Sequence, residues 1–259
     1  MKLDFVPGPV FENPIRSMAD VEKLRIPQME QDVPYVLETL KILRRELASK
    51  VPLIGFGGAP FTLACYMVEG KGSKDFAQIK RMMYTAPEVY AALMDKITTM
   101  SMEYLNAQIK AGAQCIQIFD TWGGILSPAD YERYVLPYTT RLINGLNRVE
   151  TPVIHFVKGA ATMLPIVQKA GGDVMGLDWH VNLGSARDIL GTKMGVQGNL
   201  DPTVLYASKE IIEREVKRIL DENAGRPGHI FNLGHGILPT VPPENAIYMV
   251  ECVHRLSQK

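Results

Sequence analysis

The sequence has no apolar run long enough to cross a lipid bilayer, and it has no net charge. A membrane-spanning helix needs about 20 consecutive apolar residues, and no stretch of the 259 residues approaches that length. Lys and Arg together number 28, and Asp and Glu also number 28. This balance gives no reason to expect nucleic acid or an anionic membrane surface as a partner. No apolar signal core follows residues 1–5, so secretion is not expected.

Cysteine is scarce, and the usual metal and nucleotide motifs are missing. Cys65, Cys115 and Cys252 are far apart in apolar contexts, which is typical of reduced core residues in a cytoplasmic protein. There is no C-x-x-C, H-x-C or H-E-x-x-H, and the five histidines fall on different predicted elements. The glycine-rich segment 55–60 lacks the last glycine of the dinucleotide fingerprint, and no G-K-[ST] follows it. We therefore expect neither a metal nor another cofactor.

What the sequence does contain is a repeated unit of short apolar stretch, polar loop and helical pattern. Six such stretches are predicted as strands, over 53–56, 114–119, 152–156, 173–177, 193–197 and 229–233. Their spacing is too long for hairpins, so the pattern predicts a parallel sheet in a single α/β domain covering residues 1–259. A complete barrel of this type needs eight strand–helix units, in typically about 250 residues. The sequence supplies six.

Helices are predicted between and around these strands. Ser73 is expected to cap one of them, Thr85 and Glu88 to form a capping box for another, and Pro137 to interrupt a third. Residues 3–16 are rich in proline and are predicted to be extended. The expected helices cover 17–24, 34–47, a segment from 60 onward, 73–83, 85–110, a segment from 127, one around 163–167, 185–190, 209–223 and 243–256.

The loops that follow the predicted strands collect polar residues and glycines. They read GGAP, DTWGG, VKG, DWH, GNLDP and GHG. The carboxyl ends of parallel strands meet at one edge of a sheet and carry the chemistry of α/β enzymes. This clustering predicts the functional site at that edge.

The segment 52–70, PLIGFGGAPFTLACYMVEG, is the most distinctive of these junctions. A strand that enters a helix through a glycine turn leaves backbone N–H groups free to bind an anion. Tyr66 and Glu69 follow a few residues on, and they are the only aromatic hydroxyl and the only carboxylate in an otherwise apolar segment. The alternative interpretation is an ordinary strand–helix junction with a partly buried tyrosine.

Among the histidines, His235 is the strongest candidate for a functional role. It lies between two glycines directly after a strand, where it can contact an anion or donate a proton near neutral pH. The alternative is a turn histidine that bonds the local backbone. His155 lies within a strand and is predicted to be a core residue, while His180 lies on an exit loop. His229 and His254 are interpreted as structural.

Two aspartates begin exit loops at equivalent positions. Asp120 opens DTWGG and Asp178 opens DWH. Each is equally compatible with capping the following turn and with contacting a ligand. The sequence leaves both alternatives open.

Five segments together resemble one known family. GFGGAPFTLACYMVEG, FDTWGG, GLDW, VQGNLDP and FNLGHG, in this order and spacing, are similar to uroporphyrinogen decarboxylases. The resemblance runs from about residue 6 to residue 256. It implies a (β/α)8 TIM barrel, a homodimer and a place in tetrapyrrole and haem biosynthesis. It also implies a cofactor-free reaction that converts the four acetate side chains of uroporphyrinogen III to methyl groups, giving coproporphyrinogen III.

The resemblance assigns substrate contacts to three residues. Tyr66 matches a substrate-contacting tyrosine, Thr121 matches a substrate-contacting Ser or Thr, and His235 matches a histidine that touches a substrate carboxylate. An octa-acid requires N–H donors and cations, which the strand-exit glycines and His235 supply in part. Decarboxylation without a cofactor also requires a protonated pyrrole as electron sink and a carboxylate that stabilises the cationic intermediate.

The chain departs from the family pattern at its beginning. The family's R-Q-A-G-R-Y segment, whose arginines bind substrate carboxylates, and its F-S-D segment, which carries the catalytic aspartate, are not among the 259 residues. About two strand–helix units are missing with them, in agreement with the six that the pattern predicts. We therefore expect an incomplete barrel with two unpaired sheet edges, a tendency to associate, and severely impaired decarboxylation. The catalytic residues stay unassigned.

Two other functions are compatible with a barrel of this type, a methyltransferase and a binding protein without catalytic activity. The cobalamin-dependent methyltransferases of the same superfamily place H-x-C where this chain has His155, Phe156 and Val157, so the cysteine ligand is missing. The other alternative is a barrel that binds porphyrinogen without turning it over.

Overall fold

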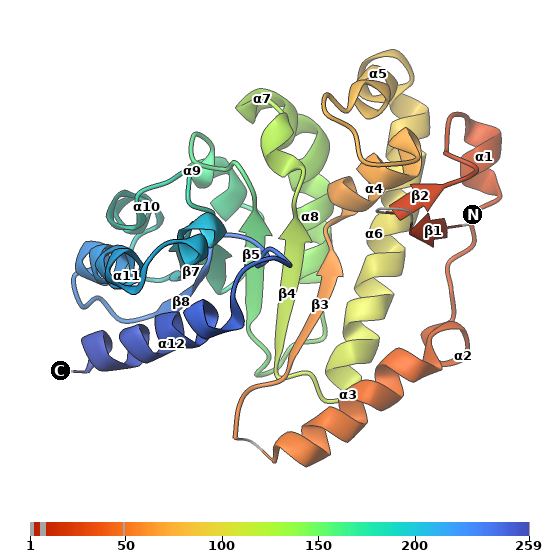
Figure 1. Cartoon of the computed structure of the whole chain (residues 1–259). Helices are drawn as coiled ribbons and strands as arrows, with labels where there is room; N and C mark the ends of the chain where they lie inside the picture. Colours follow the sequence, from red (N-terminus) through yellow and green to blue (C-terminus); the bar gives the residue numbers. More distant parts are fainter. Residues whose placement is uncertain (1–2, 6–8, 49, 259) are drawn as a thin grey trace.

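The computed structural model describes residues 3–5, 9–48 and 50–258, and it contains a six-stranded parallel sheet. The strands follow one another in chain order, and each is hydrogen-bonded to the next. All six predicted strands are present, and so is the α/β barrel-type architecture with six of eight units (Figure 1). Their bounds are β3 Ile54–Gly58, β4 Cys115–Asp120, β5 Val153–Val157, β6 Val174–Gly176, β7 Gly195–Leu200 and β8 His229–Leu233.

Helices connect the strands, as parallel pairing requires. In Figure 1 the arrows of β3, β4 and β5 point toward the end of the molecule where α5 and α7 lie, whereas α3 lies at the opposite end. None of the described helices is long and apolar enough to cross a membrane. Their bounds are α1 Met18–Glu22, α2 Met29–Asp32, α3 Pro34–Leu47, α4 Pro60–Glu69, α5 Ala77–Thr85, α6 Pro87–Lys110, α7 Pro128–Asp130, α8 Leu136–Asn144, α9 Leu164–Gln168, α10 Leu183–Leu190, α11 Lys209–Asn223 and α12 Pro243–Ser257. Short η segments cover Gly123–Ile125 (η1), Tyr131–Val135 (η2) and Pro202–Tyr206 (η3).

The two faces of the sheet have different surroundings. Ile116 and Ile118 of β4 are fully buried in apolar clusters with the surrounding helices. Gln117 and Phe119 alternate with them along the strand and line a cavity on the other face. Because successive side chains of a strand point to opposite faces, this alternation separates the packed core from the functional face.

The sheet has open edges at β3 and β8. Each of these strands has one hydrogen-bonded neighbour among the described strands. Phe56 on β3 is 61% exposed and Ile230 on β8 is 46% exposed, although both are large apolar residues. Gln108 of α6 uses its side-chain amide to bond the N–H and the carbonyl of Phe56, both at 2.9 Å. The expectation of an incomplete barrel is confirmed. At one residue of the open edge, Phe56, the Gln108 side chain makes the backbone hydrogen bonds that a neighbouring strand would otherwise make.

Several local predictions at helix ends are wrong. The Ser73 hydroxyl accepts the N–H of Phe76, but α5 begins only after Phe76, whose φ of +48° places it in the left-handed region. Thr85 belongs to α5 and donates to the carbonyl of Arg81, so it does not cap α6. Instead, Pro87 opens α6 without a side-chain cap. Proline suits the first turn because its missing N–H would have no partner there.

Two further segments show detail that the prediction lacks. The extended N-terminal stretch contains a short antiparallel pair, β1 Leu3–Phe5 and β2 Pro9–Phe11, while residues 6–8 lie outside the described part. Pro137 marks an interruption of the regular α-helix, as predicted. A π-type segment precedes it and α8 begins around it, so the missing N–H falls in a first turn, where no intrahelical donor is needed.

Candidate functional site

A cavity of about 350 Å³ lies at the carboxyl end of the sheet, on its inner face. It draws on β4, β5, β7 and β8 and on the segments that follow β4, β6 and β8. The clustering of polar exit loops predicts a site at this edge. The residues that line it are Gln117, Phe119, Thr121, Phe156, Leu177, Gln197, Asn232, Leu233, His235 and Gly236. The structure thus brings together Thr121 and His235, which are more than a hundred residues apart in the sequence.

Thr121 is held at the cavity wall by a tightly packed loop. A Cβ on Gly124 would lie 2.1 Å from the carbonyl oxygen of Lys158, and one on Gly123 would lie 2.7 Å from Cγ1 of Val157. Only glycine therefore permits the exit loop of β4 to pack this closely against the exit loop of β5. This contact fixes the backbone on the C-terminal side of Thr121.

His235 lies on the exit loop of β8, with its ring 6.1 Å from the ring of Phe156. The N–H of the preceding Gly234 donates to the carbonyl of Leu200 at 2.7 Å, which anchors the loop. The protein packed around the ring and the nearby Lys158 lower the pKa of His235, while Asp178 opposes the shift. At neutral pH the imidazole is therefore mainly uncharged, with one N–H to donate.

Tyr66 is not among the residues that line the cavity. It is half-buried on α4, and its ring meets the ring of Trp122 edge-on at 6.0 Å. The glycine turn before α4 also offers fewer free donors than predicted, because β3 extends through Gly58 and the N–H of Ala59 donates to the carbonyl of Phe119. Glu69 accepts the first N–H groups of α5, from Gln78 at 2.8 Å and Ile79 at 3.1 Å, and so has a structural role.

The structure answers the open question about the two aspartates. Asp120 is fully buried on the helix side of β4, and its Oδ1 accepts the hydroxyl of Thr62 at 2.7 Å. Burial raises the pKa of Asp120 to about 7. Asp178 is 2% exposed and accepts the N–H of Gly159 at 2.6 Å and that of His180 at 3.1 Å. Both carboxyl groups hold loops in place and neither lines the cavity.

The remaining histidines lie outside the cavity wall. His155 is fully buried on β5 with neither ring nitrogen hydrogen-bonded, and burial lowers its pKa to about 4. His229 bonds the carbonyl of Gly198 at 2.9 Å, a structural role. His180 pairs with Asp178 at 3.0 Å, and His254 is exposed near the end of α12. Among the described residues, no group of three or more His, Cys, Asp or Glu side chains is arranged to hold a metal ion.

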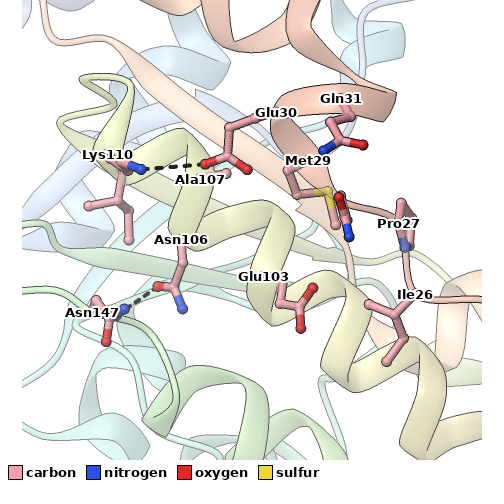
Figure 2. Close-up of a pocket in the computed structure, with 12 residues that line it drawn as sticks. Ile26, Pro27, Met29, Glu30, Gln31, Glu103, Asn106, Ala107, Lys110 and Asn147 are labelled. Carbon is pink, nitrogen blue, oxygen red and sulfur yellow. Dashed lines mark hydrogen bonds and ion pairs between the residues drawn. The ribbon is translucent and has the colours of Figure 1, made fainter.

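A larger hollow of about 910 Å³ lies elsewhere, between the segment 26–31 and α6 (Figure 2). Its charged groups are exposed, and two of them, Lys110 and Glu30, pair at 3.4 Å. Its amide groups also pair internally, since Asn106 accepts the N–H of Asn147 at 2.7 Å. Because this hollow is lined by helix and loop residues away from the strand ends, we do not assign it to the substrate.

Comparison with known proteins identifies the family. The family model described as "Uroporphyrinogen decarboxylase (URO-D)" matches residues 1–256. The chain is 85% identical over 259 residues to the uroporphyrinogen decarboxylase of Geobacter sulfurreducens, and it covers 76% of that protein. The chain belongs to the uroporphyrinogen decarboxylase family. The uroporphyrinogen decarboxylase of Pelobacter propionicus is 76% identical over 258 residues, with 76% of its length covered.

Solved structures support the fold of this uroporphyrinogen decarboxylase family member. A methyltransferase from Methanosarcina mazei superposes with a TM-score of 0.84, over 99% of this chain and 76% of its own, at 20% identity. A B12-independent methionine synthase from Shewanella gives a TM-score of 0.59 at 14% identity, over 85% of this chain and 65% of its own. At such identities the similarity concerns the fold alone. The H-x-C of the methyltransferase alternative is missing, and His155 faces away from the cavity.

Four polar residues near the cavity of this family member were not singled out from the sequence. Gln117, Gln197 and Asn232 line the cavity, and no hydrogen bond joins their amides to the described part of the protein. Lys158 follows β5, with its Nζ 5.7 Å from the ring centre of Trp179. Two features of the sequence could have indicated them. Gln117, Gln197 and Asn232 are polar residues inside largely apolar strands, and Lys158 is a cation directly after a strand.

Proposed function

We propose that this chain acts as a uroporphyrinogen decarboxylase and binds its substrate in the cavity at the carboxyl end of the sheet. The observation that carries the proposal is that Thr121 and His235 line the same cavity, in a chain whose family match spans residues 1–256. Tyr66 remains a proposed substrate contact, one layer behind the wall and linked to it through Trp122.

The polar groups around the cavity suit a tetrapyrrole with carboxylate side chains. Lys158 contributes a positive charge near His235, and the neutral imidazole donates an N–H to a substrate carboxylate. The oxygens of Gln117 and Gln197 are acceptors for pyrrole N–H groups, and the rings of Phe119 and Phe156 contact the apolar faces of the pyrroles. A bound carboxylate favours the protonated form of His235, so affinity is expected to rise as pH falls through the pKa of this residue.

The reaction breaks one carbon–carbon bond for each acetate side chain. The bond between the carboxylate carbon and the methylene carbon breaks, and its electron pair moves into a pyrrole ring that has been protonated beforehand. Carbon dioxide leaves, and protonation of the methylene carbon gives the methyl group. The ring then releases the proton that it had taken up, so that one proton is consumed for each acetate. The protein therefore binds carboxylates, orients one acetate at a time and stabilises a cationic ring.

The residues that carry the proton transfers are not assigned within this chain. The two aspartates near the strand ends, Asp120 and Asp178, are already engaged with Thr62 and with backbone N–H groups. The 259 residues contain neither R-Q-A-G-R-Y nor F-S-D, and the chain spans 76% of its relatives' length. Substrate binding and turnover are therefore measured separately.

A homodimer and a cytoplasmic location are part of the same proposal. The three cysteines are free and buried, as in proteins of reducing compartments. No nucleic acid is expected as a partner of a chain with zero formal net charge.

Titration with uroporphyrin, the oxidised form of the substrate, tests the binding step. His235→Ala is expected to weaken uroporphyrin binding about 10-fold or more, as loss of a hydrogen bond to a charged group predicts. His254→Ala is the matched control, because this exposed histidine lies on α12 away from the cavity. Equal affinities for the three proteins would contradict the proposed site, and release of carbon dioxide from uroporphyrinogen would distinguish an enzyme from a barrel that only binds.

A further inference from the structure

Behind the cavity wall, two hydrogen bonds tie the exit loop of β4 to helix α4. The Thr62 hydroxyl donates to Oδ1 of Asp120 at 2.7 Å. The hydroxyl oxygen of Thr62 also accepts the backbone N–H of Trp122, at 3.1 Å. Thr62 is 5% exposed and Asp120 is 0% exposed, so water does not compete for either bond.

Aromatic packing extends this connection to Tyr66. The ring of Trp122 lies edge-on to Tyr66 at 6.0 Å and tilted against the buried Phe76 at 4.5 Å. Thr62 and Tyr66 are four residues apart on α4, so both lie on the helix face that meets the loop. Thr121 lies between the two loop residues that Thr62 bonds, and its own side chain faces the cavity.

We propose that Asp120 and Thr62 are positioning residues that set the placement of Thr121 and Tyr66 for substrate binding. Asp120 orients the Thr62 hydroxyl, and the oriented oxygen holds the N–H of Trp122. The loop is then held on both sides of Thr121. Asp120, bonded to Thr62, holds the N-terminal side, and the N–H of Trp122 together with the glycine contact with the β5 loop holds the C-terminal side. The effect on substrate rests on the proposed function, whereas the effect on the loop does not.

One isosteric substitution breaks both links at once. Thr62→Val keeps the shape of the side chain and removes the oxygen that donates to Asp120 and accepts from Trp122. Thr62→Ser restores the oxygen and serves as the rescue variant. Thr98→Val is the matched control, since Thr98 is equally buried but bonds only the carbonyl of Met94 within its own helix.

Two readouts separate positioning from general stability. Trp122 fluorescence is observed alone in a Trp179→Phe background, because the chain has two tryptophans. In that background Thr62→Val is expected to increase acrylamide quenching of Trp122 about twofold. With native tryptophans it is expected to raise the Kd for uroporphyrin about fivefold, the factor for one hydrogen bond. Thr62→Ser should match the parent in both readouts. Thr98→Val should lower the melting temperature without changing either.

The outcomes are distinguishable. Unchanged quenching and Kd in Thr62→Val would overturn the proposal, as would equal changes in Thr98→Val. If Thr62→Val does not fold, Thr62→Ala removes the same oxygen without placing a new methyl group in the site. It is tested by the same two readouts. If the parent chain does not bind uroporphyrin, the proposed function fails, and the quenching of Trp122 still decides whether Thr62 holds the loop.

Discussion

Asp120 and His155 are expected to have opposite effects on the pH dependence of folding. Burial raises the pKa of Asp120 from 3.8 to about 7 and lowers that of His155 from 6.5 to about 4. Between the two pKa values of Asp120 the folded chain binds one proton more than the unfolded chain. The free energy of unfolding therefore falls by about 1.4 kcal/mol per pH unit as pH rises. Over the whole window the loss is about 4 kcal/mol.

For His155 the sign is reversed. Between its two pKa values the unfolded chain binds the extra proton, so the free energy of unfolding rises by about 1.4 kcal/mol per pH unit. The gain is about 3 kcal/mol across the window. The two windows overlap from about pH 4 to 6.5. Within this overlap the two contributions cancel in the unsubstituted protein.

Replacing either side chain should make visible the pH dependence of folding that the other one causes. In Asp120→Asn the free energy of unfolding is expected to rise with pH by about 1.4 kcal/mol per unit between pH 4.5 and 6.5. In His155→Leu it is expected to fall at the same rate, and the double variant should lack both slopes. Leucine also removes two ring nitrogens that have no hydrogen-bond partner, so His155→Leu should be the more stable single variant at low pH.

The measurement is urea unfolding followed by circular dichroism at half-unit steps from pH 4.5 to 8.5. Other carboxylates titrate in all four proteins and cancel when the variants are compared with the double variant. Parallel pH profiles for all four proteins would refute the assigned ionisation states of Asp120 and His155.

Three shorter predictions concern packing, the open edge and the thiols. Gly124→Ala should lower the free energy of unfolding by about 1–3 kcal/mol, because the new Cβ would lie 2.1 Å from a carbonyl oxygen. Gly72→Ala is the control and should not destabilise the fold, because its Cβ would meet nothing within 4 Å. Urea unfolding of the two variants tests the prediction. Phe56→Lys places a charge on the exposed edge strand and should reduce self-association in sedimentation velocity, whereas an unchanged distribution would contradict a role for this edge. The three cysteines should react with Ellman's reagent at pH 8 only after unfolding, because all are buried and burial raises the pKa of Cys65 and Cys115. Rapid reaction of the folded chain would contradict this prediction.

Local chemistry accounts for the parts of this protein that its sequence determined. Each strand was visible as an apolar run, and each exit loop as a cluster of glycine and polar residues, because these preferences act over a few neighbouring residues. Helix starts at Pro34 and Pro243 were correct for the same reason. Family membership also followed from short segments whose order and spacing are specific. Helix starts that depended on Ser73 and Thr85 were wrong. The Ser73 hydroxyl accepts the N–H of Phe76 before α5 begins, and the Thr85 hydroxyl donates to the carbonyl of Arg81 within α5.

Only the tertiary structure decided which side of the sheet each polar residue serves. Asp120 and Thr121 are adjacent, yet one is buried among helices and the other lines the cavity. A strand turns successive side chains to opposite faces, and the face that becomes the core depends on how the helices pack. The local sequence around Tyr66 was enough to indicate the family. The connection of Tyr66 to the cavity wall, through Trp122 and Thr62, depends on contacts between α4 and the β4 loop. These residues are about sixty positions apart, and no local pattern records their contact.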